Sequence, residues 1–322
     1  IEGHILIGEK TSYPFFISGL HFNNNQRFAE AIGEQGGVGC QFWNKEVGDV
    51  RRAAQELSHP VSITAYTRIG FLNEGEDRFY TPSVIVSPAG IAANTDTVID
   101  LSEVEHARHL DFSILDEETF HTTCRHIVDD LLDLTDHLVT YPLAGHTFIS
   151  PFLSRLDASP HSSGERCILW VTGITGSSKS FAALRFANFF GSFHIGKSVN
   201  SWTSTPYQIQ KVGHHFADGL YLVDDYKAKN LSGRTEQVTQ ILQAYADGRG
   251  RGRLNSDASV KQTYVIRGNL LVTGEDLPDY ESSNLARVIV IHPTSREKDT
   301  RRGRACLKHQ VNYRGITPAF LH

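Results

Sequence analysis

The chain lacks several features that would place it in a specialised class of protein. Its 322 residues contain no apolar run of about 18 residues and no signal segment, so we expect no membrane contact and a cytoplasmic location. Only four cysteines occur, and none belongs to a C-x-x-C pair. That excludes a disulfide framework and the usual zinc sites, and it favours a reducing compartment. Methionine is absent, which is rare in a natural chain of this length.

Positive charge is also scarce. The formal net charge is −5, from 31 basic and 36 acidic residues. The surface as a whole therefore does not attract nucleic acid, and any such contact must come from local basic clusters. The hydrophobic content of 40% is ordinary for a soluble globular protein. The length exceeds what one hydrophobic core usually covers, so we expect more than one domain.

The first half of the chain is expected to hold two smaller parts. Residues 1–112 predict an α+β domain, because YPFFISGL and VSITAY are typical of strands while QRFAEAIGEQ and DVRRAAQELS have helical apolar spacing. Residues 113–160 predict a helical connector that starts at a capping pattern, Ser113 and Asp116, and ends in a turn-rich linker.

Residues 161–295 alternate apolar strands with helices. Strands are expected in CILWVTG, GLYLVDD, GNLLVTGED and RVIVIH, with helices in SFAALRFANFFG and TEQVTQILQAYADG. Continuous apolar strands with intervening helices indicate an α/β fold, in which helices cover both faces of a parallel sheet. Residues 296–322 are expected to form a basic C-terminal tail, with seven basic and two acidic side chains between Arg296 and Arg314.

The stretch VTGITGSSKS nearly matches the phosphate-binding pattern G-x-x-x-x-G-K-[ST]. An expected strand precedes it and an expected helix follows, so backbone N–H groups would converge on an anion at a helix N-terminus. Lys179 would place its charge on the β and γ phosphates of ATP, and Ser180 would offer its hydroxyl to Mg²⁺. The predicted cofactors are ATP and Mg²⁺, and the predicted binding residues are Gly173, Thr175, Gly176, Ser177, Ser178, Lys179 and Ser180.

The loop departs from the pattern at Ser178, where glycine is usual. Gly176 is the position expected to need a positive φ. If Ser178 has a negative φ at the helix entry, a serine there costs little, and we interpret it as a tolerated variant. The alternative is a Gly/Ser-rich turn that precedes Lys-Ser by chance.

The segment GLYLVDDYK has the form of a second nucleotide motif, a buried strand that ends in two acids. Asp224 would bind Mg²⁺ through water, and Asp225 would polarise the attacking water. Thr273, at the end of the next strand, could orient that water; an ordinary strand-ending threonine is an equal alternative. Arg287 could act as an arginine finger on a neighbouring subunit. An ordinary surface arginine that caps a strand is an equal alternative.

Together these residues resemble ring-forming helicases of the AAA+/superfamily III type. More narrowly, they resemble the helicase-like domain of mobile-element, phage and plasmid replication proteins, which often accompanies primase domains. The resemblance covers about residues 165–295 and rests on GITGSSKSFAALRFANFFG, WTSTPYQIQKVGHHFADGLYLVDDYK and VTGEDLPDYESSNLARVIVI. It implies a P-loop NTPase sheet of the AAA+/RecA-like ASCE kind, a homo-hexamer, and a primase as a possible partner.

An arginine–glycine segment, DGRGRGRLNSDASVKQTYVIRG, lies between the second motif and the Thr273 strand. In the class that the chain resembles, a hairpin at this position points into the central channel. Four side chains are therefore predicted to bind the phosphates of single-stranded DNA without reading bases, namely Arg249, Arg251, Arg253 and Lys261. A solvated loop without a ligand is the alternative.

We therefore expect an ATP-dependent DNA helicase or translocase that replicates a mobile element, phage or plasmid. Two alternatives stay open. One is a nucleotide-gated initiator or loader that holds DNA without unwinding it. The other is a small-molecule kinase with a phosphate loop, which would ignore DNA; the arginine–glycine segment argues against it.

Overall fold

The chain divides into two units, Ile1–Thr64 and Ala65–His322. The structure is a computed structural model, and it describes residues 2–3, 6–7, 10–11, 15–16, 22, 24–36, 47–57, 65–73, 75–159, 161, 166–228, 235–249, 253–254, 260–261, 264–277, 286–293 and 299–322. The division falls earlier than the expected boundary at 112. The expected boundaries near 160 and 295 coincide with residues outside the described ranges.

Within its described residues, the first unit has two helices of 11 and 12 residues and two short antiparallel strand pairs. The helices α2 (Asn25–Gly36) and α3 (Val47–Leu57) lie where helical spacing predicted them. The strand pairs are β1 (Glu2–Gly3) with β4 (Phe15–Phe16), and β2 (Leu6–Ile7) with β3 (Lys10–Thr11). Of the strand expected in VSITAY, only β5 (Ala65–Tyr66), which belongs to the second unit, lies within the described residues.

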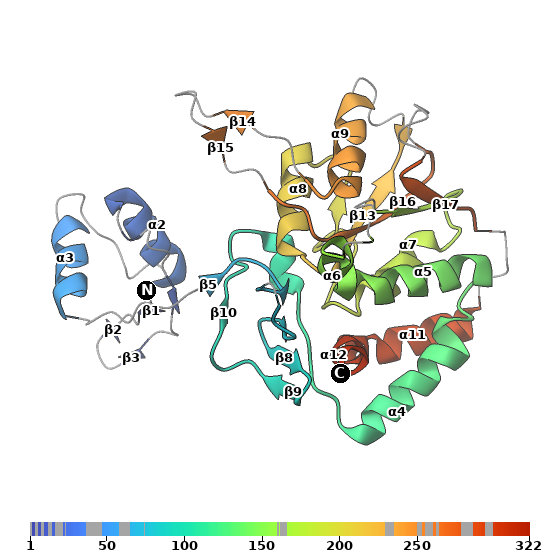
Figure 1. The fold of residues 1–322 in the computed structure, drawn as a ribbon, viewed down its shortest axis with the longest axis horizontal. Coiled ribbons are helices and arrows are strands. Elements are labelled where there is room, and N and C mark those ends of the chain that lie inside the picture. Colours follow the sequence, from blue (N-terminus) through green and yellow to red (C-terminus); the bar gives the residue numbers. More distant parts are fainter. Residues whose placement is uncertain are drawn as a thin grey trace. The chain divides into compact units, whose positions relative to one another are not determined.

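The second unit is built around a five-stranded parallel sheet with the order β12-β13-β16-β11-β17 (Figure 1). Every residue of the two neighbouring strands β11 and β16 is buried, as the continuous apolar runs predicted. The strand bounds are β11 Ile168–Thr172, β12 Asn200–Ser201, β13 Leu220–Tyr226, β16 Asn269–Gly274 and β17 Val288–Ile291. The sequence analysis identified four of these strands and missed the two-residue β12.

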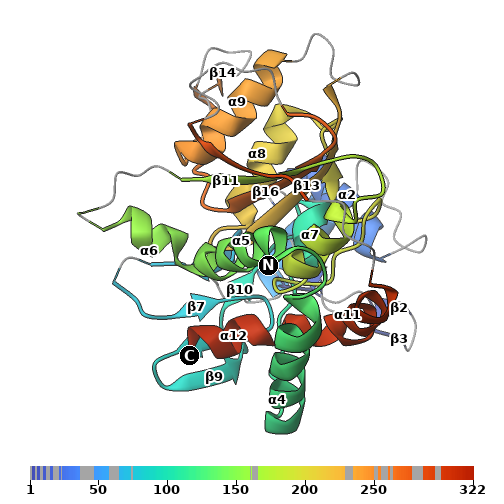
Figure 2. The same cartoon turned by 90° about the vertical axis from the view of Figure 1, so that its right-hand side faces the viewer.

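Helices cover both faces of this sheet, which confirms the predicted α/β architecture (Figures 1 and 2). On one face, α7 (Lys179–Ala187) packs against β13 and β16, and α5 (His137–Ile149) packs against β11 and α7. On the other face, α9 (Thr235–Ala246) packs against β11 and α8 (Pro206–His215). The strands are parallel, so their carboxyl ends share one edge of the sheet and their amino ends share the other.

A four-stranded antiparallel meander, β6-β7-β8-β9, precedes the parallel sheet in the sequence. Its apolar side chains, including Phe79, Val84 and Val86, belong to the same hydrophobic cluster as the parallel sheet. Because the two sheets share one core, residues 65–112 belong to the second unit. The strand bounds are β6 Gly70–Phe71, β7 Phe79–Tyr80, β8 Val84–Ser87 and β9 Gly90–Ala93, and β5 pairs in parallel with β10 (Val98–Ile99).

The expected connector and the expected tail pack against each other. Asp116 caps α4 (Glu117–His126) by accepting a hydrogen bond from the Thr119 N–H at 2.8 Å, and a π-helical turn follows at Ile127–Leu131. The C-terminal residues form α11 (Thr300–Tyr313), which packs against α4, and α12 (Ile316–Leu321), which packs against β8. Residues 300–321 are therefore a packed helix pair, because Cys306, Tyr313 and Ile316 are buried.

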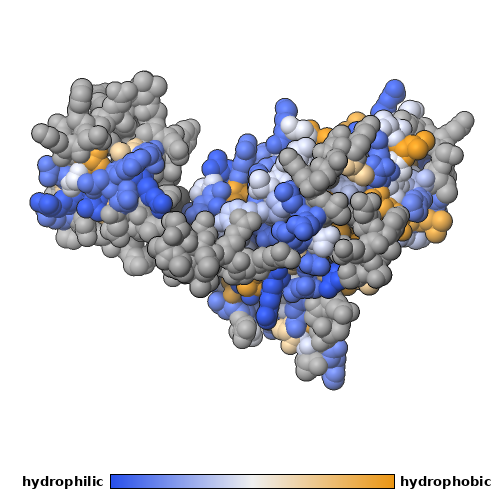
Figure 3. Space-filling view, turned by 90° about the horizontal axis from the view of Figure 1, so that it is seen from above, coloured by the Kyte–Doolittle hydropathy of each residue, from blue (hydrophilic) through white to orange (hydrophobic). Residues whose placement is uncertain are grey.

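The surface of the described residues is mainly hydrophilic when it is viewed from above (Figure 3). Apolar residues on this face form only small patches among blue and pale ones. The large apolar side chains that are exposed include Ile174, with 77% exposure in the loop after β11, and Ile289, with 49% on the edge strand β17. None of the helices in the described ranges is long and apolar enough to cross a membrane.

A buried carboxylate, Asp218, ties the meander to the segment that leads into the parallel sheet. It accepts hydrogen bonds from the Phe71 N–H at 3.1 Å and from the Ser154 N–H and hydroxyl at 2.8 and 2.9 Å. Ser154 belongs to the short helix α6 (Leu153–Asp157), and Phe71 belongs to β6. Burial raises the pKa of Asp218 to about 6, although these donors favour its charged form.

Asp218→Asn should weaken the pH dependence of stability. A pKa that is raised in the folded state adds stability below the unfolded value, and that stability is lost as the pH rises through about 6. The free energy of unfolding of the wild-type protein should therefore gain about 1 kcal/mol, relative to the variant, between about pH 7.5 and about pH 5. Urea unfolding at both pH values measures this, and an identical pH dependence in the two proteins would contradict it.

Candidate functional site

The loop between β11 and α7 contains two residues in the left-handed region. Gly176 has a φ of 85°, which confirms the predicted positive φ. Ser178 has a φ of 63°, so the condition under which a serine would cost little here, a negative φ, is not met. The chain turns from strand to helix here, and the turn imposes on serine a conformation that glycine adopts more easily. For a residue with a Cβ the cost is about 1–2 kcal/mol.

The start of α7 and the loop before it have the features of an anion cradle. Helix α7 begins at Lys179, and the side chain of its N-cap residue Ser178 makes no capping hydrogen bond. The Lys179 side chain is buried, and its Nζ donates to the Ile174 carbonyl at a long 3.3 Å. The buried Ser177 hydroxyl has no hydrogen-bond partner in the described part of the chain. Unsatisfied donors and a positive charge thus face a helix N-terminus, where anions bind well.

Asp224 connects three segments at the carboxyl edge of the sheet. The carboxylate is buried, and its Oδ1 accepts a hydrogen bond from the Ser180 hydroxyl at 2.7 Å. The same oxygen accepts a hydrogen bond from the fully buried Thr273 hydroxyl. The predicted residues Ser180, Asp224 and Thr273 therefore lie together. Because the Thr273 hydroxyl donates to Asp224 in this structure, its role in orienting water stays a prediction.

A β-bulge makes the side chains of the neighbouring residues Asp224 and Asp225 point in different directions. The register between β13 and β16 shifts between Val223 and Tyr226, and Asp225 has a φ of 62°. Bulges re-aim side chains at the ends of strands. Asp224 thus contacts α7 and β16, whereas the exposed Asp225 lies 3.1 Å from the Lys227 amine.

Lys227 and Glu275 complete the site, and the sequence analysis missed both. The Lys227 amine lies 3.1 Å from Asp225 and 3.3 Å from Glu275, and these hydrogen bonds raise its pKa. Glu275 also accepts a hydrogen bond from the Thr175 hydroxyl, which, together with Lys227, holds the pKa of that carboxyl below its usual value. The signal available in the sequence was position alone: Lys227 directly follows β13, and Glu275 directly follows β16.

Arg287 lies at the opposite edge of the sheet from the loop. Its carbonyl accepts a hydrogen bond from the Ile168 N–H at 2.9 Å, at the start of β11, whereas the loop follows the end of that strand. Four steps along a strand span about 13 Å. The Arg287 guanidinium lies 3.4 Å from the Asp247 carboxylate. Arg287 is thus placed away from the loop of its own chain.

The structure describes the segment of the predicted DNA-binding residues only in part. The strands β14 (Arg253–Leu254) and β15 (Val260–Lys261) pair antiparallel, with Arg253 opposite Lys261. At the base of this segment, Arg249 is exposed and forms a backbone bridge with Val265. Arg251 and the side chains of Arg253 and Lys261 lie outside the described residues.

Few protein side chains are predicted to bind the Mg²⁺ ion. Within the described ranges, no group of three or more His, Cys, Asp and Glu side chains is placed to hold a metal ion. Ser180 and Asp224 would supply only part of a magnesium shell. This is compatible with Mg²⁺, which usually binds through one or two carboxylates together with water and substrate phosphates.

Comparison with known proteins shows the fold. No protein family and no curated protein matches the sequence. A solved structure described as the active helicase SCCmec type IV Cch is similar, with a TM-score of 0.55 and 16% identity over 97% of this chain and 55% of that one. The chain thus has the fold of part of that helicase and spans about 55% of its length.

Two further solved structures are more distant. An inhibitor-bound JCV helicase has a TM-score of 0.38 and 15% identity, over 64% of this chain and 54% of that one. The C-terminal region of NrS-1 has a TM-score of 0.36 and 10% identity, over 84% of this chain and 59% of that one. These scores are too low to support an argument.

The left-handed conformation of Ser178 predicts how substitutions there affect stability. Ser178→Gly removes the steric cost but increases the freedom of the unfolded chain, so the free energy of unfolding should change by less than about 1 kcal/mol. Ser178→Val places a β-branched residue in the same conformation and should lower the free energy of unfolding by about 2 kcal/mol. Urea denaturation of both variants tests this, and equal stability of the two would refute the assigned conformation.

Proposed function

We propose that the chain is an ATP-hydrolysing motor of the P-loop, AAA+/superfamily III type that translocates on DNA as a hexamer. The observation that carries the proposal is the Asp224 carboxylate, which accepts hydrogen bonds from both Ser180 and Thr273 beside the loop. In a P-loop site, Mg²⁺ is held by the hydroxyl that ends the phosphate-loop motif and by an acid at the end of a strand, so these two groups must lie close together. The shared fold with a solved helicase supports the same assignment.

The residues present fit ATP and Mg²⁺. The uncapped start of α7 and the buried Ser177 hydroxyl leave donors for phosphate oxygens, which would also replace the long contact between Lys179 and Ile174. Ser180 would hold the metal directly, and Asp224 would hold it through water. Bound ATP supplies the phosphoanhydride bond that is cleaved, and Mg²⁺ neutralises charge on its oxygens.

Asp225 is the proposed general base. It is exposed beside the loop, so it can reach a water molecule, whereas Asp224 is buried and already accepts two hydrogen bonds. Lys227, whose amine lies 3.1 Å from Asp225 and 3.3 Å from Glu275, would restrain the position of the Asp225 carboxylate. Glu275 also bonds Thr175, so the same cluster would link the base to the loop.

The position of Arg287 favours a ring. It lies at the amino edge of the sheet, so it could reach the nucleotide of a neighbouring subunit but not that of its own chain. Guanidinium suits this role because it spreads its charge and offers several donors to phosphate oxygens. In such a ring the β14–β15 hairpin would bind one DNA strand through its arginines. The sequence resemblance supports a role in replicating the DNA of a mobile element, phage or plasmid.

Lys179→Ala and Asp225→Asn should both abolish ATP turnover, but for different reasons. The lysine variant loses charge on the phosphates and should bind ATP at least about tenfold more weakly. The aspartate variant keeps the cradle and should bind ATP with unchanged affinity. Phosphate release and binding of a fluorescent ATP analogue measure the two effects.

Two exposed residues serve as matched controls for these variants. Lys308→Ala and Asp129→Asn change the same residue types on α11 and in the π-helical turn, far from the site in the sequence, and should leave turnover unchanged. Equal loss of ATP binding in Lys179→Ala and Asp225→Asn would contradict the assigned roles. Unwinding of a forked duplex by the wild-type protein separates a helicase from a loader that only holds DNA.

Arg287→Ala should bind ATP normally yet hydrolyse it about 10³-fold more slowly, because a finger in trans acts on the transition state. Mixing this variant with Lys179→Ala provides the decisive measurement. Some interfaces would then pair an intact loop with an intact arginine, so partial ATPase activity should return. No recovery in rings that are shown to be mixed would indicate a role within one chain, and wild-type activity in Arg287→Ala alone would remove the assignment.

A further inference from the structure

Arginines line the amino edge of the parallel sheet. Arg166, Arg267 and Arg287 stand one or two residues before β11, β16 and β17, which are neighbouring strands. Only Arg287 has a role in the proposed nucleotide chemistry. Because all the strands run the same way, these residues are brought to one edge although they are far apart in the sequence.

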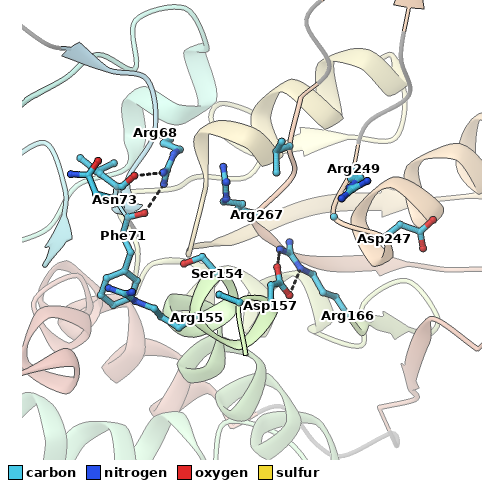
Figure 4. Close-up of a pocket in the computed structure, with 14 residues that line it drawn as sticks. Arg68, Phe71, Asn73, Ser154, Arg155, Asp157, Arg166, Asp247, Arg249 and Arg267 are labelled. Atoms are coloured by element: carbon cyan, nitrogen blue, oxygen red, sulfur yellow. Dashed lines mark hydrogen bonds and ion pairs between the residues drawn. The ribbon is translucent and has the colours of Figure 1, made fainter. Parts of the chain in front are cut away.

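A cavity of about 610 Å³ lies at this edge (Figure 4). Its walls come from the turn around β6, the helix α6, the end of α9 and the segment before β16. The charged residues of the lining are Arg68, Arg155, Arg166, Arg249, Arg267, Asp157 and Asp247. Five guanidinium groups therefore face two carboxylates, so the described lining carries an excess of positive charge.

Three of the five arginines have structural partners. Arg166 forms an ion pair with Asp157 and donates to the Ile266 carbonyl at 2.8 Å. Arg68 donates to the carbonyls of Phe71 and Leu72 at 2.9 and 2.8 Å. The guanidinium of the remaining one, Arg155, lies 4.3 Å from the centre of the Phe71 ring.

The other two arginines, Arg249 and Arg267, differ from these three. Neither the Arg249 nor the Arg267 guanidinium forms a hydrogen bond or ion pair within the described part of the chain. Figure 4 shows Arg267 between Arg68 and Arg249. Burial and then the charge of Arg267 lower the pKa of Arg68. Like charges that are held together in a cavity are stabilised by an anion that enters it.

The shape and chemistry of the cavity favour phosphate over a nucleobase. The aromatic ring in its lining, Phe71, already has the Arg155 guanidinium over one face, 4.3 Å from the ring centre, so that face is not available for stacking with a base. Arg249 and Val265 line the cavity and also form the backbone bridge at the base of the hairpin. A strand that runs along the hairpin would therefore pass the mouth of the cavity with its repeated phosphates.

We propose that this cavity binds backbone phosphates of a single nucleic-acid strand, with Arg267 and Arg249 as the contacting residues. The proposal rests on the proposed function, in which the adjacent hairpin holds the strand. It assigns DNA contact to Arg267, the last arginine of the arginine–glycine segment, in addition to the four side chains predicted from the sequence. Guanidinium suits the task because its planar donors pair with two phosphate oxygens at once.

Arg267→Ala tests the proposal through binding of a fluorescent oligothymidylate of about 20 nucleotides, measured by anisotropy at several salt concentrations. Affinity should fall about tenfold, and the dependence of log K on log salt should flatten by about 0.7–1, because one phosphate contact is lost. Arg267→Lys keeps the charge and should keep most of the affinity. Arg125→Ala, which removes an exposed arginine from α4, should bind like the wild-type protein.

A second arm uses inorganic tripolyphosphate as a competitor, to separate nucleic acid from free polyphosphate. Loss of tripolyphosphate binding alone in Arg267→Ala, with oligonucleotide affinity intact, would overturn the nucleic-acid assignment. Unchanged oligonucleotide affinity in this variant, or no oligonucleotide binding by the wild-type protein, would overturn the cavity proposal itself.

ATPase activity without DNA separates this result from the proposed function. It should be equal in Arg267→Ala and in the wild-type protein, because the cavity lies at the edge away from the loop. Wild-type protein that binds the oligonucleotide through Arg267 but hydrolyses no ATP would refute the motor while leaving the cavity proposal standing. Normal thermal unfolding of Arg267→Ala shows that any loss is not a failure to fold.

Discussion

The site depends on one carboxylate oxygen, Asp224 Oδ1, and on the two hydroxyl groups that donate to it. Ser180 lies on the helix that follows β11, Asp224 lies near the end of β13, and Thr273 lies on β16 between those strands. The placement of β16 between β13 and β11 is therefore a condition of the contact. A buried carboxylate also requires such donors, because an unpaired charge at this depth would be costly.

The groups of the candidate nucleotide site and the arginine cluster lie at opposite edges of the sheet. The carboxyl edge holds the loop, the two acids and the cluster of Lys227 with Glu275, whereas the amino edge holds Arg287 and the arginine cavity. The length of the strands keeps Arg287 away from the loop of its own chain. In the proposed ring, Arg287 acts on the nucleotide of a second subunit, and the arginine cavity at the same edge is the proposed contact for a nucleic-acid strand.

The segments around the sheet are parts of one core. The meander of residues 70–93 shares its buried side chains with the sheet, and Asp218 ties Phe71 to Ser154 across the boundary between them. The C-terminal helices pack on α4 and β8. The walls of the arginine cavity come from these same junctions, so the cavity depends on how the meander, α6 and the sheet are joined.

The sequence by itself determined the main strands and helices of the sheet, because apolar runs and helical spacing are local signals. It also identified Ser180, Asp224 and Thr273 as candidates, since loop and strand-end patterns are local too. It did not determine the left-handed φ of Ser178, because the turn between strand and helix sets that angle. Tertiary structure decided three further features, because each depends on which distant segments the folded core brings together. They are the ion pair of Lys227 with Glu275, the position of Arg267 beside Arg68, and the division of the chain after Thr64.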